Sequence, residues 1–194
     1  MALDLPTLQD THVTLEPLTP DHVPALERAA ADGELWNLWF TSVPAPGRMT
    51  GYVEAALRGH AEGHMLPFVV RERSNNEIVG CTRYCHYDPA VPHIEIGYTW
   101  YAKAWQRSHV NTHCKLLLLD YAFEVLGCAA VELRTDRYNT VSQRAIERLG
   151  ARRDGILRAH MRRPDGTLRD TVVYSITAND WPDVQRLLAM KMDC

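Results

Sequence analysis

The nine residues WQRSHVNTH (Trp105–His113) join two segments of opposite character, and this junction decides the fold. The preceding run, HIEIGYTWY (His93–Tyr101), is apolar and rich in β-branched and aromatic residues, which predicts a strand. The run CKLLLLDYAFEVL (Cys114–Leu126) predicts a helix that starts near His109 and ends at Gly127. Free N–H groups and the positive end of the helix dipole meet at such a junction, so it can hold an anion. Glycines often shape these loops, yet this stretch contains none.

Strands and helices are expected along the whole chain on both sides of this junction. Apolar and period-two runs predict strands at 12–18, 66–72, 77–87, 92–101 and 129–136, and a hairpin within 155–176 around the turn PDG. Helical patterns predict helices at 19–32, 50–59, 109–126, 139–150 and 179–190, with Asn139 and Asp180 as N-caps of the last two. The sum is one α/β domain whose mixed sheet carries helices on its faces.

Composition and charge limit the possible partners. The 194 residues are 46% hydrophobic, enough for a real core in one domain, and the formal net charge is −3. Residues 1–100 carry 6 basic and 13 acidic side chains, whereas residues 101–194 carry 15 and 11. A bound anion therefore belongs to the second half, and nucleic acid is not expected as a partner.

Cysteine usage and hydropathy point to the cytoplasm. The five cysteines are odd in number and lack the spacing of a disulfide framework, so reduced thiols are expected. The segments CTRYCH and HVNTHC lack paired Cys-x-x-Cys spacing, so zinc is not expected. The start MALDLPTLQD resembles no signal peptide, and no apolar run is long enough to span a membrane. We therefore expect a cytoplasmic protein with no membrane partner.

The order of these segments resembles a known family. The strand, the loop AKAWQRSHVN, the helix, the next strand and RYNTVSQRAIERLGA together resemble the GNAT superfamily of acetyl-CoA-dependent N-acetyltransferases. The similarity is greatest to the branch of ribosomal-protein N-terminal alanine acetyltransferases, and it runs from about His12 to Val184. It implies a single domain over residues 1–194 with its core at about 12–184. The implied fold is a mixed, mostly antiparallel sheet flanked by helices, with a splayed strand pair for the coenzyme.

The resemblance also implies an activity. A GNAT enzyme passes acetyl from acetyl-CoA directly to a primary amine in a ternary complex, with no metal and no covalent enzyme intermediate. Coenzyme A and an amine are thus the expected partners. The acceptor could be a protein N-terminus or a small-molecule amine, and homodimer formation stays open. The alternative is a non-catalytic acyl-CoA-binding or regulatory module of the same fold, which the histidine at position 109 favours.

In that family the loop has the pattern Gln/Arg-x-x-Gly-x-Gly/Ala, and its amides hold the coenzyme pyrophosphate. Gln106 fits the first position, whereas His109 and Asn111 replace the small residues. Backbone N–H groups do the binding, and His and Asn tolerate positive φ better than most residues, so we expect binding to persist. The alternative is a helix start capped by Ser108 with no ligand. The resemblance assigns the coenzyme to Thr99, Trp100, Tyr101, Gln106, Arg107, Ser108, His109, Val110, Asn111, Thr112, Asn139 and Arg144.

Two residues are candidates for catalysis. An amine arrives protonated, and Glu95 is the carboxylate best placed to remove its proton, directly or through a water. A structural salt bridge is the competing interpretation of Glu95. By resemblance, Ser142 protonates the leaving thiolate. The aromatic side chains Trp36, Trp39 and Phe40 are expected to line the acceptor side.

Overall fold

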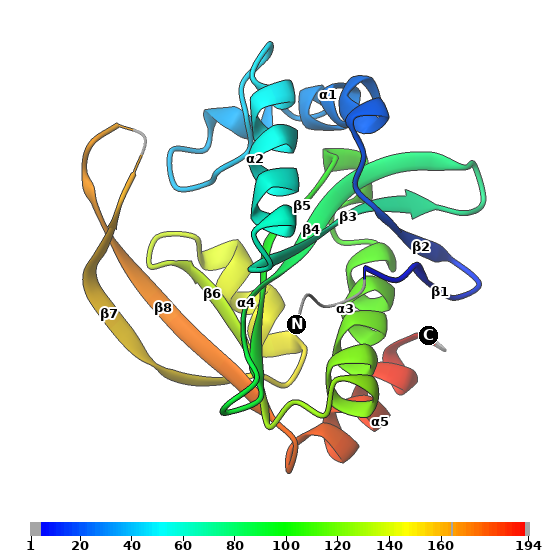
Figure 1. The fold of residues 1–194 in the computed structure, drawn as a ribbon, viewed down its shortest axis with the longest axis vertical. Helices are drawn as coiled ribbons and strands as arrows, with labels where there is room; N and C mark the ends of the chain where they lie inside the picture. Colours follow the sequence, from blue (N-terminus) through cyan, green and yellow to red (C-terminus); the bar gives the residue numbers. More distant parts are fainter. Residues whose placement is uncertain (1–4, 164, 193–194) are drawn as a thin grey trace.

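The computed structural model describes residues 5–163 and 165–192. Eight strands form one open sheet in the order β1-β2-β3-β4-β5-β6-β8-β7 (Figure 1). The strands are β1 (Leu8–Gln9), β2 (Val13–Pro17), β3 (Met65–Glu72), β4 (Glu77–Asp88), β5 (His93–Tyr101), β6 (Ala130–Asp136), β7 (Arg152–Arg162) and β8 (Leu168–Thr177). Neighbouring strands are antiparallel except β5 and β6, which are parallel and joined through a crossover helix. The predicted mixed, mostly antiparallel sheet is confirmed.

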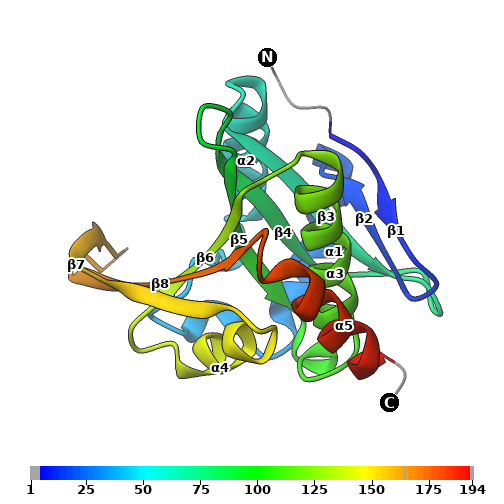
Figure 2. The same cartoon turned by 90° about the horizontal axis from the view of Figure 1, so that it is seen from below.

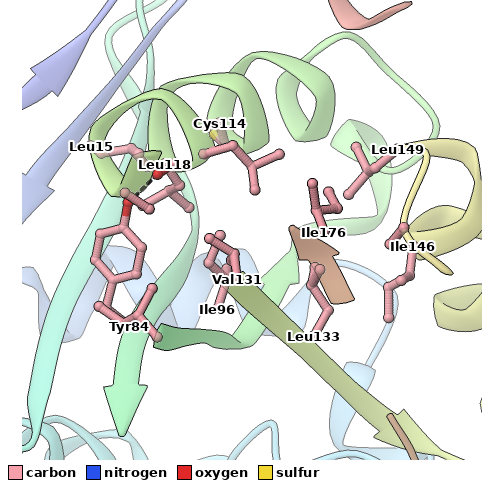
Figure 3. Packing of buried hydrophobic residues seen from close by; sticks show 14 of the residues in the cluster. Leu15, Tyr84, Ile96, Cys114, Leu118, Val131, Leu133, Ile146, Leu149 and Ile176 are labelled. Atoms are coloured by element: carbon pink, nitrogen blue, oxygen red, sulfur yellow. Dashed lines mark hydrogen bonds between the residues drawn. The ribbon is translucent and has the colours of Figure 1, made fainter. Parts of the chain in front are cut away.

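Helices cover both faces of this sheet (Figures 1 and 2). The α-helices are α1 (Val23–Ala31), α2 (Met49–Ala61), α3 (Val110–Asp120), α4 (Thr140–Arg148) and α5 (Trp181–Met192). One apolar cluster joins α1 and α2 to the sheet, and the other joins α3, α4 and α5 to the opposite face. In the second cluster, α3 packs over β4, β5 and β6, and the Tyr84 hydroxyl donates to the Leu118 carbonyl (Figure 3). The loop before α3 is therefore held at the edge of a packed core.

Two local expectations need correction. The single helix expected at 109–126 is α-helical only to Asp120 and continues as one π-helical turn, Tyr121–Val125. Asp180 directly precedes α5 and its carbonyl accepts from the Val184 N–H, as expected of an N-cap, but its carboxylate accepts from the N–H and hydroxyl of Thr177 and not from a helix N–H. The hairpin expected within 155–176 is confirmed as β7 and β8, although Pro164 of its turn lies outside the described residues.

The sheet opens between its two parallel strands. β5 and β6 pair from His93–Ala130 only as far as Ile96–Leu133. Beyond that point β5 stays paired with β4 up to Tyr101, while β6 stays paired with β8 up to Asp136. The predicted splay of this strand pair is therefore confirmed as a loss of pairing, and it leaves one edge of each strand free next to the loop before α3.

The β4–β5 pair is irregular at the same level. The register shifts between Cys81 and Arg83, and Tyr98 on β5 has a φ of 53°, a left-handed conformation that is rare for aromatic residues. Nearby, β4 approaches β5 so closely that a Cβ on Gly80 would lie 2.1 Å from the carbonyl oxygen of Trp100. A glycine is therefore required at position 80.

Gly80→Ala is expected to lower the free energy of unfolding by about 1–3 kcal/mol or more, because the new methyl group meets backbone that cannot rotate away. Urea denaturation measures the change. Gly155→Ala on β7 is the control, since nothing lies within 4 Å of its added Cβ, and it should change stability by about 0.5 kcal/mol or less. Equal stabilities of the two variants would contradict the steric argument.

Candidate functional site

The loop before α3 makes its turn without glycine, but not at the residues expected. A 3-10 turn at Lys103–Trp105 leads into Gln106, and Arg107 alone in this loop takes a positive φ, 61°. His109 has a φ of −63° and is already helical as the N-cap of α3. The tolerance of His109 and Asn111 for positive φ is therefore not used, because the helix begins early enough for the turn to fall on Arg107.

This loop presents main-chain donors at the N-terminus of α3. The Val110 N–H bonds the Ser108 hydroxyl, which itself donates to the Trp105 carbonyl, so Ser108 caps the helix as the ligand-free interpretation expects. Among the residues that the structure describes, the N–H groups of Arg107, Ser108, His109 and Asn111 donate to no protein acceptor. Several unpaired donors at the positive end of a helix form an anion site. Capping by Ser108 and anion binding are thus compatible.

A cluster of histidines, which the sequence did not reveal, packs between this loop and the strands β1 to β3. The rings of His12, His109 and His113 lie 4.5–5.5 Å apart, and His113 Nδ1 lies 2.6 Å from the Asp10 carboxylate. His109 Nε2 lies 3.9 Å from the Glu72 carboxylate. The His109 side chain therefore packs against the β1–β2 and β3 side. His109 and His113 are neighbours one helical turn apart, but His12 and Asp10 join them only through contacts about a hundred positions apart, which no local motif reveals.

This cluster predicts a pH dependence of stability. Burial, together with the neighbouring His113 and His12, holds the pKa of His109 below its ordinary value of 6.5. The folded protein binds this proton less readily than the unfolded chain, so the stability gained from neutral His109 is complete above pH 6.5 and is lost as pH falls through the lowered pKa. The urea midpoint should fall from pH 7 to pH 5, and it should fall less in His109→Gln. Identical pH profiles for both proteins would contradict this role.

The end of β5 carries Thr99, Trp100 and Tyr101, which were predicted to bind the coenzyme. Their side chains point to different faces of the sheet. Thr99 faces α3, where its hydroxyl lies 2.8 Å from Thr82 Oγ1 and accepts from Lys115 Nζ at 2.8 Å. Trp100 is buried in the cluster of α1 and α2. The Tyr101 carbonyl accepts a hydrogen bond from the Gln106 side chain, so Gln106 braces the loop against β5.

Lys115 is a second feature that sequence reasoning missed. Its side chain is buried on α3 beside the opening between β5 and β6, and burial lowers the pKa of its ammonium group to about 8. Lysine is rarely buried without a carboxylate. Its place in the apolar run CKLLLL was the signal that could have marked it.

The N-terminus of α4 carries the second predicted pair. Asn139 is the N-cap, and its side-chain oxygen accepts from the Ser142 N–H at 3.0 Å, so the predicted cap is confirmed. The Ser142 hydroxyl has no protein partner among the described residues, and the side chain is half-buried. Arg144 is exposed, while Arg148 reaches across to Thr112 on α3 at 3.4 Å. The C-terminal end of α4 thus reaches the first turn of α3 through this side chain.

Glu95 lies on β5 on the face opposite α3. Its carboxylate lies 3.1 Å from His86 Nδ1 and 3.5 Å from Arg134 Nε, and Arg134 also binds Glu132 at 2.6 Å. Glu132 is the parallel neighbour of Glu95 across the β5–β6 pair. The salt bridge of the competing interpretation therefore exists, and it also holds the carboxylate in one place beside a histidine. Proton transfer by Glu95 stays a prediction.

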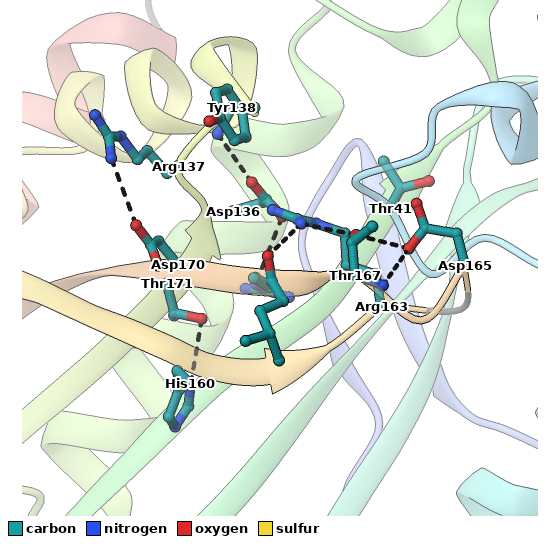
Figure 4. Close-up of polar contacts among 12 residues, drawn as sticks. Thr41, Asp136, Arg137, Tyr138, His160, Arg163, Asp165, Thr167, Asp170 and Thr171 are labelled. Atoms are coloured by element: carbon teal, nitrogen blue, oxygen red, sulfur yellow. Dashed lines mark hydrogen bonds and ion pairs between the residues drawn. The ribbon is translucent and has the colours of Figure 1, made fainter.

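The three aromatic residues expected on the acceptor side, in the loop between α1 and α2, lie in two different environments. Trp39 packs edge to face on Phe40, and its ring lies 4.8 Å from the Arg163 guanidinium. Arg163 comes from the tip of the β7–β8 hairpin, which reaches up beside this loop (Figure 1), and pairs with the fully buried Asp136 at 2.9 Å (Figure 4). Trp36 instead lines a separate apolar hollow of about 310 Å³ between α1 and α2. The structure thus brings together two of the three predicted aromatic residues.

Comparison with known proteins identifies the class to which this open sheet and its main-chain cradle belong. Residues 12–152 match the family model described as Acetyltransferase (GNAT) domain. The chain therefore belongs to the GNAT acetyltransferase family, as the sequence predicted. No group of three or more His, Cys, Asp or Glu side chains in the described part of the chain is arranged to hold a metal ion. No helix in that part is long and apolar enough to cross a bilayer.

Three relatives illustrate the match. A candidate acetyltransferase from T. thermophilus is 34% identical, and its structure superimposes with a TM-score of 0.88 over 99% of this chain and all of that one. An uncharacterized N-acetyltransferase, p20 of Bacillus licheniformis, is 23% identical over 120 residues, which span 62% of this chain and 66% of p20. RimJ of Mycobacterium smegmatis, solved in complex with CoA-disulfide, is 22% identical with a TM-score of 0.77 over 96% of this chain and 93% of RimJ, and shares the fold.

Proposed function

We propose that this chain transfers acetyl from acetyl-CoA to a primary amine within a ternary complex. The observation that carries the proposal is the group of four unpaired N–H donors at the start of α3, next to the opening between β5 and β6. Membership of the GNAT family supports acetyl transfer, and the RimJ structure supports a coenzyme A ligand by analogy. Acetyl-CoA, when bound, supplies the acetyl group as a thioester.

The residues of the chain fit this ligand in both of its parts. A pyrophosphate needs several converging N–H donors, which the loop from Arg107 to Asn111 offers. The pantetheine arm of the coenzyme needs hydrogen-bonding groups along the opening. The edge of β5 that no longer pairs with β6 beyond Ile96 offers them. Asn139 keeps its side-chain NH₂ group available while its oxygen caps α4.

Three groups of the chain then share the chemistry. The acceptor ammonium first loses one proton and becomes a neutral nucleophile. Its nitrogen then forms a bond to the acetyl carbon as the carbon–sulfur bond breaks, and the second proton that the nitrogen loses balances the proton that the sulfur gains. Glu95 accepts the amine proton, directly or through a water. A main-chain N–H near Thr99 polarises the acetyl carbonyl. Ser142 donates to the departing sulfur, and its otherwise unpartnered hydroxyl supports that role.

A matched pair of substitutions at position 109 tests the cradle. His109→Ala keeps the N–H and removes only the imidazole, so coenzyme affinity should stay within about threefold of the wild type. His109→Pro fits the φ of −63° but removes the N–H, and the loss of one hydrogen bond to a charged group should weaken binding about 10- to 100-fold. Calorimetric titration with coenzyme A measures both.

Circular dichroism must show that the proline variant keeps its helices. Equal losses in both variants would mean that the imidazole, and not the main chain, holds the ligand. A screen of primary amines with thiol release as readout tests the transfer itself. Tight coenzyme binding without turnover on any amine would favour the alternative, a non-catalytic acyl-CoA-binding module.

A further inference from the structure

A buried arginine beside the predicted reaction centre has no counterion. Arg83 on β4 is 3% exposed, and no carboxylate in the described part of the chain lies within 4 Å of its guanidinium. Other buried or half-buried arginines nearby are paired, Arg134 with Glu95 and Arg163 with Asp136. A buried cation is stable only when charges or dipoles compensate it.

Two aromatic rings give part of this compensation. The Arg83 guanidinium lies between the rings of Tyr52 and Tyr98, at 4.3 and 4.5 Å from their centres. Its Nη1 atom contacts the Met65 sulfur at 3.3 Å. The rings hold the plane of the guanidinium fixed through cation–π attraction, but they accept none of the hydrogen bonds that lie in that plane.

The unused donors of Arg83 form one complete binding edge. Its Nε and Nη2 atoms are buried and have no hydrogen-bond partner. These two nitrogens point their N–H bonds in parallel along the same side of the guanidinium, which is the edge that matches the two oxygens of a carboxylate. Nη1 has a partner, whereas Nε and Nη2 do not, so these two donors, called the fork below, are free to bind a carboxylate.

This fork lies on the same sheet face as Glu95. Arg83 pairs across the strands with Gly97, and Cys85, two residues further along β4, pairs with Glu95. Two residues span about 7 Å along a strand, so one small molecule can reach both groups. Burial raises the pKa of the Cys85 thiol to about 12, with Glu95 adding to the rise and Arg83 opposing it, which puts both charges in one neighbourhood.

Tyr98 lies between the Arg83 guanidinium and the solvent. Its ring covers the guanidinium from the solvent side and is itself 40% exposed. Its positive φ places it at the irregular point of β5, where the main chain leaves the regular β conformation. Because Nε and Nη2 are both buried, an acceptor can reach this edge only after neighbouring side chains move, and the half-exposed Tyr98 ring is one side chain in contact with the guanidinium.

We propose that Arg83 binds a carboxylate of the acceptor, so that the chain acetylates amines that carry a carboxylate close to the amino group. This inference rests on the proposed acetyl transfer. The carboxylate can come from a free amino acid or from an acidic residue at the start of a peptide. A neutral amine would leave the guanidinium edge unpaired and would be a poor acceptor.

The test compares acceptors that differ only in the carboxylate. Alanine is paired with alaninamide, and the peptide Glu-Ala-amide with Gln-Ala-amide, and kcat and KM are measured for each. The wild type should prefer at least one carboxylate partner about 10- to 100-fold in kcat/KM, mainly through KM. The pair that shows the preference identifies the source of the carboxylate.

Two variants assign that preference to the fork. Arg83→Met should abolish it by raising KM for the carboxylate acceptor, with kcat within about threefold and the neutral acceptor unchanged. Arg83→Lys keeps the charge but loses the fork, and should recover only part of the preference. Arg71→Met, on the neighbouring strand and paired with Glu16, is the control and should keep it all. A wild type without preference, or a preference that survives in Arg83→Met, overturns the proposal.

A binding measurement separates this inference from the proposed function. Saturation-transfer NMR with N-acetylalanine and N-acetylalaninamide needs no turnover, and only the carboxylate compound should bind the wild type. This difference should disappear in Arg83→Met, and it should be clearly reduced in Arg83→Lys, which serves if the methionine variant does not fold. Binding of both compounds alike overturns the role of Arg83 even if amines are acetylated. Selective binding without acetylation of any amine supports the fork and refutes the transfer reaction.

Discussion

Asp136→Asn is expected to lower the free energy of unfolding by about 3–5 kcal/mol, the typical cost of leaving one member of a buried ion pair alone. The Asp136 side chain is fully buried, accepts from Arg163 Nε at 2.9 Å and from the Tyr138 N–H, and also lies 4.0 Å from Arg169. The Arg163 guanidinium is almost as buried, and one of its nitrogens already lacks a partner. Without the carboxylate charge, Arg163 (Figure 4) and Arg169 lose this counterion.

Urea denaturation at pH 7 measures this change, and the same hairpin supplies a control. Asp170 pairs with the exposed side chains of Arg137 and Arg158, so Asp170→Asn should lower the stability much less than Asp136→Asn does. The double variant Asp136→Leu with Arg163→Met should be more stable than Asp136→Asn, because no charge is then stranded on that pair. Similar losses from Asp136→Asn and Asp170→Asn would mean that the buried pair is not what holds the hairpin.

Glu95→Gln is expected to lower kcat on the order of 10²-fold or more while coenzyme affinity stays nearly unchanged, if Glu95 removes the amine proton. Glutamine keeps the size of the side chain and can still bond Arg134, so a structural role alone predicts a much smaller change. Turnover at saturating amine is measured from pH 6 to 9.

Glu132→Gln is the matched control for this substitution. Glu132 on β6 lies beside Glu95 on β5 and also pairs with Arg134. The histidine contact to His86 belongs to Glu95. Its replacement should leave kcat within about threefold. Unchanged turnover in Glu95→Gln across the whole pH range, or an equal loss in both variants, would reduce Glu95 to a member of the salt-bridge network.

Local patterns predicted the elements and the cradle because those depend on neighbours in sequence. The strand at His93–Tyr101, the cap at Asn139 and the donor-rich turn before α3 follow from propensities and from hydrogen-bond needs of helix ends. Which loop residue takes the positive φ could not be predicted, since the start of a helix is uncertain by one or two positions and that uncertainty moves the turn.

Contacts between distant segments could not be predicted in the same way. The pairing of Asp10 with His113 and of Asp136 with Arg163 depends on how the finished sheet brings loops together. The missing counterion of Arg83 is also visible only after every neighbour is in place, because a single arginine in a strand pattern is usually solvated or paired. The predicted acceptor and the branch within the family stay predictions.

The short parallel pairing between β5 and β6 is a weak connection between the two parts of this sheet. Four residue pairs connect the five strands on one side to the three on the other within the sheet, and the ladder stops where the opening begins. Amide hydrogens that flank the open end are therefore poorly protected by strand pairing. A ligand that forms hydrogen bonds to the free edges of both β5 and β6 would link the two strands where they do not pair. Its binding should therefore slow amide hydrogen exchange in both strands.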